Sequence, residues 1–305
     1  EDEAIPFLIT QLGVRRGLKV DLYGVAGVHG DYHGHPHLPK SLGHRILSNP
    51  RHRNGLQVPQ LQDEYLALLY HLAYHKPSQS GIAFEKPEKT IASKYTAMLH
   101  ALENECQIPN PPTTLTEIHK ELLAADLGIT YDRLRRYLQH DFSLHHKTMF
   151  HARLMETYPG ELNLYVIREV AIRHEMAGAL LEALEENFTI LTVKNIPWWT
   201  RLTTSRHIRG GKWRRGGRPH IAVVVFDSDP TPTNSEEQTA HPFVFNARQF
   251  LKQHWRERFH QLSGARSKDN PIHSTDNEAE AIGHLPLFFS DEEIDDIVTQ
   301  VTALR

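Results

Sequence analysis

The chain has one cysteine, Cys106, among 305 residues, and it lacks any apolar run long enough to cross a membrane. A lone cysteine cannot build an internal disulfide framework, so we expect a reducing compartment, the cytoplasm. A membrane helix needs about 18 to 20 successive apolar residues, so we expect no membrane partner, and no signal peptide is recognisable. The formal net charge of -3 gives no overall attraction to polyanions. Any anion binding must therefore come from local clusters of cations.

Several common catalytic signatures are also missing. The sequence contains no Walker A run, no Gly-x-Ser-x-Gly elbow and no paired cysteine motif. ATP binding through a P-loop and hydrolysis through a nucleophile elbow are therefore not indicated.

Apolar spacing predicts a mainly helical first part, residues 1–159. Leucines and alanines recur at three- and four-residue steps from Asp63 to Lys76, and further helices are expected at 94–105, 116–127 and 131–138. Thr114, with Glu117 three residues later, predicts a capped helix start. Before these helices, residues 18–23 are expected to form a strand.

The predicted secondary structure changes at Pro159-Gly160 from mainly helices to alternating strands and helices. We expect a second domain to begin there and to span residues 160–305. Strands are predicted at 162–170, 189–194 and 221–226, with a helix at 172–187 between the first two. Helices at 246–261, 277–283 and 291–303 complete the pattern. The whole chain is therefore expected to be an α+β protein.

The most informative motif runs from Asn270 to Asn277 and reads Asn-Pro-Ile-His-Ser-Thr-Asp-Asn. It places the imidazole of His273 beside small hydroxyls and a carboxylate, at what we expect to be the start of a helix. Helix N-terminal amides attract anions, and hydroxyl groups can orient an imidazole. This combination favours a histidine that accepts a phosphoryl group.

Two anchors resemble nucleoside diphosphate kinases. The segment from Leu164 to Lys194 resembles the family's opening strand, helix and second strand. The motif at 270–277 resembles the family's Asn-x-x-His-Gly-Ser-Asp-Ser. The two anchors are in the family's order and have a similar separation. The resemblance implies a ferredoxin-like, nucleoside diphosphate kinase-like α/β sandwich in residues 160–305.

The resemblance also implies roles for particular residues. His273 matches the histidine that becomes phosphorylated, and Thr275 matches the hydroxyl near it. Asn270 matches the amide that contacts the nucleotide, and Arg168 stands where the family has its phosphate-binding lysine. Arg248 matches a phosphate-binding arginine, and a second could be supplied by Arg256, Arg258 or Arg266.

Some positions depart from the family pattern. Glu169 and Val170 follow Arg168 where the family has Pro-Asp, and Ser274 follows the histidine where the family has Gly. The family's carboxylate that orients the histidine falls at His284. Residues 197–245 do not follow the family's base-binding lid.

The resemblance implies a phosphotransferase that uses Mg²⁺ with a nucleoside triphosphate such as ATP and forms a phosphohistidine at His273. Its partners would be a nucleotide or another phosphorylated small molecule, and it could be a homo-oligomer as the family typically is. The alternative is a catalytically degenerate module that binds nucleotide as a scaffold.

A basic stretch lies between the predicted strands of the second domain. Residues 201–218 contain seven cations, two Gly pairs and Trp213. Cations with flexible glycines and an aromatic ring can hold phosphates or a polyanion, although a solvated basic loop has the same composition.

The first part also contains histidine clusters. His29, His33, His35 and His37 alternate in a Gly/Pro loop, and His71 and His75 lie four apart on one helix. Neither spacing fits a specific zinc signature, so we assign no metal site. We expect the first four histidines to belong to an ordinary polar loop and the last two to be core or capping residues.

The first part further resembles, weakly, the latter half of a bacterial nucleotidyltransferase. In that family a metal-binding carboxylate sits on a strand like Lys19 to Tyr23, ahead of a helix like that at 63–76. Asp21 would be the last of three Mg²⁺ ligands, and the first two would lie upstream of Glu1. A third possible function is therefore that this chain forms part of an enzyme that transfers a nucleotidyl or sugar-phosphate group.

Overall fold

The structure, a computed structural model, describes residues 38–76, 80–83, 94–138, 148–199, 215–266 and 268–305. The chain divides into two compact units, Glu1–Thr130 and Tyr131–Arg305. The boundary between the units thus lies about 30 residues before the boundary near residue 160 that the sequence suggested. The reason is that two helices, α6 (Tyr131–Leu138) and α7 (Thr148–Met155), pack against α13 (Glu278–His284) of the second unit.

The described part of the first unit consists of helices and one short hairpin. Its elements are α2 (Lys40–Ser48), β1 (Arg51–Arg53), β2 (Leu56–Val58), α3 (Leu61–Tyr70), the π-helical turn η2 (His71–His75), α4 (Lys94–Cys106) and α5 (Leu115–Ala124). The hairpin turns through Asn54 and Gly55, both at positive φ, as a tight Asn-Gly turn requires. The predicted helices are all present, whereas the strand expected at 18–23 lies outside the described residues.

One hydrogen-bonded chain joins η2, α5 and the loop that follows α5 in the first unit. The hydroxyl of Tyr74 accepts from the amide of Ile129 at 3.1 Å and lies 2.6 Å from Nδ1 of His119. Burial lowers the pKa of His119 to about 4, so the ring is neutral and accepts the hydroxyl proton. At the start of α5, Thr114 and Glu117 form the predicted capping box.

The second unit is built on a four-stranded antiparallel sheet in the order β4-β5-β3-β6. Its strands are β3 (Glu161–Arg168), β4 (Thr189–Asn195), β5 (Pro219–Asp227) and β6 (Ile272–Ser274). The first and third strands in sequence are therefore the central pair. The β-branched, apolar residues of β3 and β5 are buried along their whole length, which explains why these two strands could be predicted.

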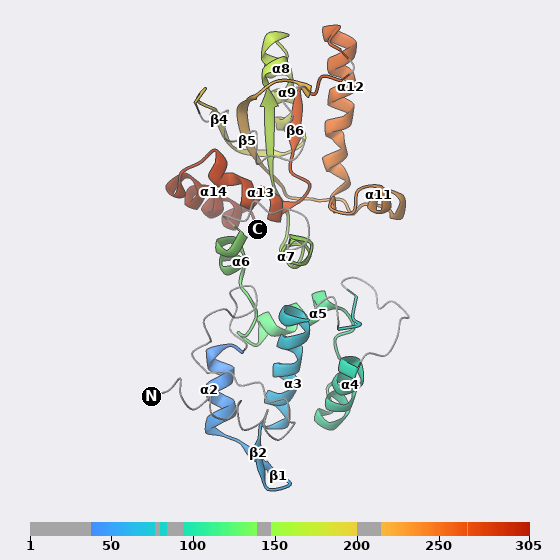
Figure 1. Cartoon of the computed structure of the whole chain (residues 1–305), viewed down its shortest axis with the longest axis vertical. Coiled ribbons are helices and arrows are strands. Elements are labelled where there is room, and N and C mark those ends of the chain that lie inside the picture. Colours follow the sequence, from blue (N-terminus) through green and yellow to red (C-terminus); the bar gives the residue numbers. More distant parts are fainter. Residues whose placement is uncertain (1–37, 77–79, 84–93, 139–147, 200–214, 267) are drawn as a thin grey trace, which may run out of the picture. The chain divides into compact units, whose positions relative to one another are not determined.

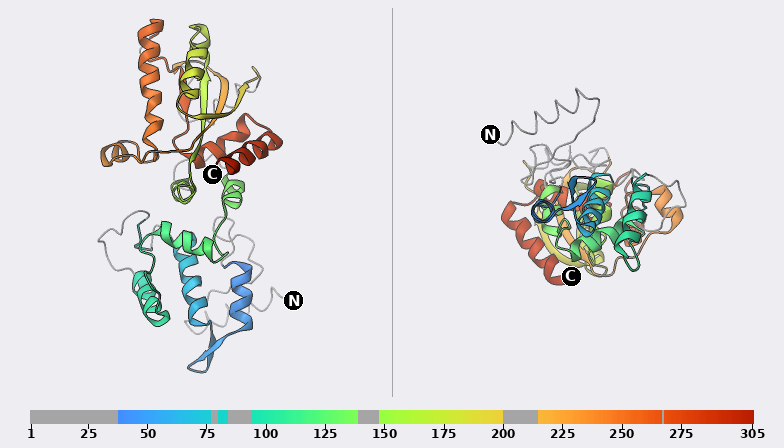
Figure 2. Two further views of the ribbon diagram at one scale, coloured as in Figure 1. Left: turned by 180° about the vertical axis from the view of Figure 1, so that it is seen from behind. Right: turned by 90° about the horizontal axis from the view of Figure 1, so that it is seen from below.

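Helices cover both faces of this sheet. In the sequence, α8 (Glu169–Arg173) and α9 (Ala177–Glu185) lie between β3 and β4, and α12 (Leu251–Ser263) lies beside β6 (Figure 1). Tyr165 and Ile167 pack with Leu180, Leu184 and Trp255 on the face that α9 and α12 cover. The view from behind shows α13 and α14 (Asp291–Leu304) beside each other near the lower end of the sheet (Figure 2). Shorter helices, namely α11 (Ser235–Ala240), η5 (Ala247–Phe250) and η6 (Leu285–Leu287), complete the unit.

A buried ion pair ties α13 to both ends of the unit. Arg305 donates from Nη2 to both carboxylate oxygens of Glu278 at 2.8 Å, and Tyr131 donates to the same carboxylate at 2.6 Å. The amide of Leu162 donates to it as well, at 3.1 Å. Only 5% of the Glu278 side chain is exposed, so these donors take the place of the water molecules that would otherwise solvate the charged carboxylate.

Removal of this carboxylate should destabilise the second unit strongly. In Glu278→Ala, the guanidinium of Arg305 stays buried without its counter-ion, which costs about 3 to 5 kcal/mol. All four tryptophans belong to residues 131–305, so urea unfolding followed by tryptophan fluorescence reports on this unit. Asp296→Ala, at an exposed position of α14, is the matched control and should change the free energy of unfolding little. Equal stability of the two variants would contradict the assigned role of Glu278.

A second buried cluster lies at the start of β3. The side-chain amide of Asn246 donates at 2.8 Å to Glu161 and at 2.8 Å to Asp227, and Arg248 pairs with Asp227 at 2.7 Å. Burial raises the pKa of Glu161 to about 8, whereas hydrogen bonds from Asn246 and Asn163 oppose the rise. Glu161 is therefore protonated in the folded protein at neutral pH.

This protonation should make stability depend on pH. The pKa of Glu161 rises from its ordinary 4.5 to about 8 on folding, so the stability it contributes is fully present below pH 4.5 and is lost as the pH rises through about 8. Glu161→Gln keeps a neutral acceptor and should flatten this decline in urea unfolding series between pH 5 and about 8. Glu185→Gln, at an exposed position of α9, should retain it. Parallel pH profiles for wild type and Glu161→Gln would contradict the raised pKa.

Candidate functional site

His273 lies on an edge strand. It pairs with Val166 of β3 in the antiparallel ladder between β3 and β6. The sequence-based expectation of a helix start is therefore corrected, because β6 precedes α13, which begins only at Glu278. The side chain of His273 projects from the same face of the sheet as that of Val166.

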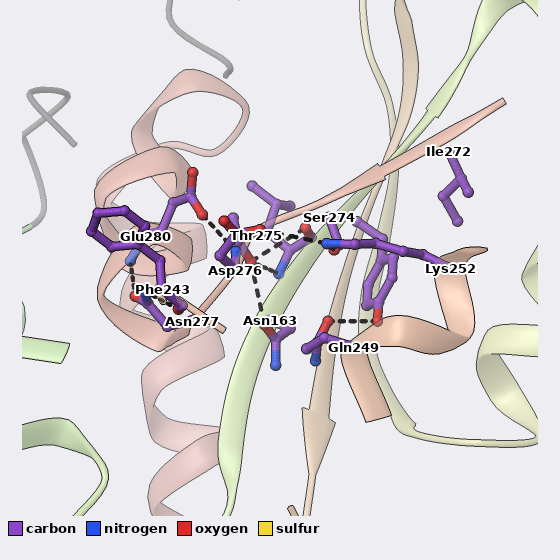
Figure 3. A network of polar contacts seen from close by, with 12 residues as sticks. Asn163, Phe243, Gln249, Lys252, Ile272, Ser274, Thr275, Asp276, Asn277 and Glu280 are labelled. Carbon is purple, nitrogen blue, oxygen red and sulfur yellow. Dashed lines mark hydrogen bonds and ion pairs between the residues drawn. The ribbon is translucent and has the colours of Figure 1, made fainter. Parts of the chain in front are cut away.

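The residues after His273 secure the strand and cap the next helix. The Oγ1 of Thr275 accepts from the amide of Leu164 at 3.1 Å, and its own amide donates to the Leu164 carbonyl at 3.0 Å. Asn277 caps α13 by accepting from the amide of Glu280 (Figure 3). The Thr275 hydroxyl thus helps to hold β6 against β3. This is the hydroxyl that the sequence predicted near the imidazole, and the structure places it on the backbone of Leu164.

Positive charges act on the imidazole of His273. Its ring is partly buried, and its Nε2 is buried without a hydrogen-bond partner among the described residues. Burial lowers the pKa of His273 well below its usual value, and the charges of Arg168, Lys252, His284 and Arg256 lower it further. The imidazole is therefore neutral at physiological pH and has a free lone pair on one nitrogen.

Arg168 ends β3 beside this histidine. Its amide donates to the carbonyl of Pro271 at 2.8 Å, and its Nη1 donates to the carbonyl of Arg215 at 3.1 Å. Burial and the neighbouring Arg256 lower the pKa of Arg168 to about 10, so the guanidinium remains charged at neutral pH. The charge of Arg256 is thus close enough to disfavour the protonated form of Arg168.

Asn270 is fixed beside the last residues of the basic stretch. Its amide donates to the carbonyl of Arg215 at 3.0 Å, and its side-chain oxygen accepts from the amide of Ile272. Gly216 approaches the Asn270 backbone so closely, at a φ of 119°, that a Cβ would lie 2.1 Å from its carbonyl oxygen. Only glycine fits there. Residues 215–218 are thus held against the site, whereas 201–214 lie outside the described residues.

Two further cations come from α12. Arg256 donates from Nε and Nη2 to the carbonyl of Ile272 at 3.1 and 2.9 Å, immediately before His273. One turn earlier, Nζ of Lys252 donates to Oγ of Ser274 at 2.8 Å and lies 3.4 Å from Asp276 (Figure 3). Residues four apart share a helix face, so this face presents both cations to β6.

The sequence reasoning missed Lys252. The signal that could have found it is its spacing of four from Arg256, combined with a hydroxyl and a carboxylate after the histidine. Neither feature is conclusive without the strand that brings Ser274 and Asp276 to α12.

The structure does not bring Arg248 to His273. Arg248 pairs with Asp227 and donates to the backbone carbonyl of Asn187. Asp227 is opposite Glu161 at the start of β3, about 16 Å along the strand from Val166. Arg258 and Arg266 are exposed.

The other residues that the sequence singled out are placed as follows. His284 is buried at the end of α13, and its charge contributes to the lowered pKa of His273. The rings of His71 and His75 contact each other edge to face, with centroids 5.4 Å apart. Among the described residues, no three His, Cys, Asp or Glu side chains form a group that could hold a metal ion. Asp21 and the four histidines at 29–37 lie outside that part.

No helix within the described ranges is both long enough and apolar enough to span a membrane.

Comparisons with known proteins give little support beyond the geometry. No protein-family model matches the chain, and no curated protein matches it. Among solved structures, a nucleoside diphosphate kinase of Aquifex aeolicus is similar at 15% identity and a TM-score of 0.27, over 44% of this chain and 98% of that chain. Similarity at this level does not establish a shared fold or activity.

The cations should control the titration of the imidazole. Lys252→Met removes one positive neighbour, so the pKa of His273 should rise, although burial still holds it below its usual value. A pH titration of the histidine Cε1–H signals by NMR measures this, and the spectrum of His273→Ala identifies the relevant signal. Lys120→Met, at an exposed position of the first unit, is the control. The same pKa of His273 in the wild type and in Lys252→Met would rule out this electrostatic interaction.

Proposed function

We propose that the second unit is a phosphotransferase-like domain that binds the phosphates of a nucleotide around His273. The observation that carries the proposal is a neutral imidazole whose pKa is lowered by the charges of Arg168, Lys252 and Arg256, on a strand fixed by hydrogen bonds to two of these residues. The charges of Arg168, Lys252 and Arg256 all act on this imidazole, and phosphoryl transfer needs cations that offset phosphate charge beside a nucleophile.

We further propose a ferredoxin-like, nucleoside diphosphate kinase-like arrangement for this unit. The support is the strand order β4-β5-β3-β6, all antiparallel, with helices between the first and second strands and between the third and fourth. This is the β-α-β-β-α-β pattern. Fold does not fix function, so the activity rests on the site.

In the proposed reaction, the imidazole nitrogen attacks the γ-phosphorus of a nucleoside triphosphate. A nitrogen–phosphorus bond forms while the bond to the β-phosphate oxygen breaks, and its electron pair leaves with the nucleoside diphosphate. The cations offset the charge on the phosphate oxygens, and a lowered pKa keeps the nucleophile unprotonated. Asn270, half-buried next to Arg215, is the proposed contact to the nucleotide.

Mg²⁺ is the proposed cofactor, carried by the nucleotide. The described residues offer no group of three acidic or histidine ligands, which fits an ion bound mainly through phosphates and water. Bound there, it would neutralise phosphate charge.

Incubation with γ-labelled ATP and Mg²⁺ tests the transfer. We expect an acid-labile, base-stable label on the wild type that is absent from His273→Ala and retained in His254→Ala, the control at an exposed histidine of α12. Arg168→Met and Lys252→Met should each reduce the initial labelling rate, by about 10- to 1000-fold if each stabilises the transferred charge as one oxyanion donor does. The absence of label on the wild type would refute phosphotransfer.

The second candidate is a module that binds nucleotide without chemistry. Its support is His284, an imidazole where the resembled family has the carboxylate that orients the histidine. Calorimetry separates the two: tight nucleotide binding that Arg168→Met weakens, with no label, favours the binding module. No binding at all would rule out both.

A further inference from the structure

Three segments of the second unit meet at the backbone of Arg215 and Gly216. The carbonyl of Arg215 accepts two hydrogen bonds, from Nη1 of Arg168 at 3.1 Å and from the amide of Asn270 at 3.0 Å. The carbonyl of Gly216 accepts from the amide of Val170 in α8 at 2.9 Å. This short stretch before β5 therefore contacts two of the residues that the proposed function assigns to the nucleotide.

Gly216 permits these contacts because it has no side chain. Its φ of 119° is a conformation that other residues rarely adopt, and a Cβ there would lie 2.1 Å from the carbonyl oxygen of Asn270. Since Cβ atoms keep a distance of at least 3.0 Å, the two would have to separate by about 1 Å. The obstacle is backbone rather than the end of a flexible side chain, so a larger residue at 216 would displace the backbone of Asn270.

A displaced Asn270 would disturb the site in two ways. Its amide would move away from the Arg215 carbonyl, which also accepts from the guanidinium of Arg168. The carbonyl of the next residue, Pro271, accepts from the amide of Arg168 at 2.8 Å, and His273 follows two residues later in β6. The position of Gly216 is thus coupled through the backbone to a cation of the site and to the candidate nucleophile.

The first two amides of α8 are used within the protein. Those of Glu169 and Val170 donate to the carbonyls of Arg218 and Gly216 at 3.0 and 2.9 Å. They are therefore not the donors that a phosphate would find at this end of β3. In the proposed function, that role falls to the guanidinium of Arg168, so its placement matters.

We propose that Gly216 is a positioning residue of the candidate site, because it lets the Arg215 carbonyl hold Arg168 and Asn270 together in the arrangement that binds the phosphates. This assignment rests on the proposed function, nucleotide binding around His273. Gly216 contacts neither the nucleotide nor the imidazole in this arrangement and acts through the backbone alone.

Gly216→Ala tests the assignment, with Gly264→Ala as the matched control. Gly264 also has a positive φ, 63°, but nothing lies within 4 Å of a Cβ added there. Both variants therefore strain the backbone, and only one collides with Asn270. Gly216→Ala should weaken the binding of ATP with Mg²⁺ in calorimetry and lower the initial labelling rate about 100-fold, the effect of a displacement of about 1 Å at a reacting site. Gly264→Ala should behave as the wild type does.

The pKa of His273 provides a second readout that needs no nucleotide. Among the charges that lower this pKa, that of Arg168 acts most strongly. A displaced guanidinium should therefore raise the pKa of His273 in Gly216→Ala and leave it unchanged in Gly264→Ala, as measured by NMR titration of the histidine Cε1–H signals. A loss of stability alone would not move the pKa of the molecules that remain folded.

Gly217→Ala is a second variant for the case that Gly216→Ala does not fold. Gly217 has a φ of 84°, and a Cβ there would lie 2.7 Å from the side chain of Glu169 rather than from backbone. This change presses on the same stretch from the side of α8, so the effects should have the same direction. Urea unfolding followed by tryptophan fluorescence shows which variants are folded.

The outcomes separate this proposal from the proposed function. A His273 pKa in Gly216→Ala that equals that of the wild type would overturn the positioning role, and so would equal effects of Gly216→Ala and Gly264→Ala on ATP binding. If the wild type binds no ATP, the proposed function fails and Gly216 positions no phosphate ligand. The NMR titration then shows whether Gly216 still places the charge of Arg168 beside the imidazole.

Discussion

The pairing of β6 with β3 is the constraint on which the candidate site depends. β6 has only three residues and lies at the edge of the sheet, so its ladder alone is weak. Its place is set by groups outside the ladder: Arg256 on the Ile272 carbonyl, Lys252 on the Ser274 hydroxyl and Thr275 on the backbone of Leu164. The groups that position His273 are thus partly the same groups that charge its surroundings.

Placing these positive groups close together has an electrostatic cost. Arg168 and Arg256 are both largely buried, each has a lowered pKa because of burial, and Arg256 lowers the pKa of Arg168 further. Backbone carbonyl groups accept hydrogen bonds from both guanidinium groups. In the proposed function, a bound phosphate would offset part of this cost, whether it reacts or only binds.

The sequence predicted the secondary structure of both units well where one signal dominated. The apolar runs of β3 and β5 and the capping box at Thr114 are local patterns with one physical reading. β6 was missed because three residues carry no periodicity, and only its partners on β3 and α12 make it a strand. The same limitation applied to the site. The spacing of His273 and Arg168 pointed to one location, but Arg248 pairs with Asp227 elsewhere, and no sequence pattern distinguishes an arginine that binds a ligand from one that binds a buried carboxylate.

The protonated Glu161 makes the stability of the sheet depend on pH in a range where His273 does not titrate. The carboxyl lies at the opposite end of β3 from His273, and its pKa of about 8 belongs to the folded state of the sheet rather than to the histidine. His273, with its pKa lowered, has no proton left to lose in that range. A loss of function as the pH rises from 5 to about 8 would therefore follow the stability of the sheet, whereas a loss near pH 10 would follow deprotonation of Arg168, and only the acid side of a pH profile would describe the nucleophile.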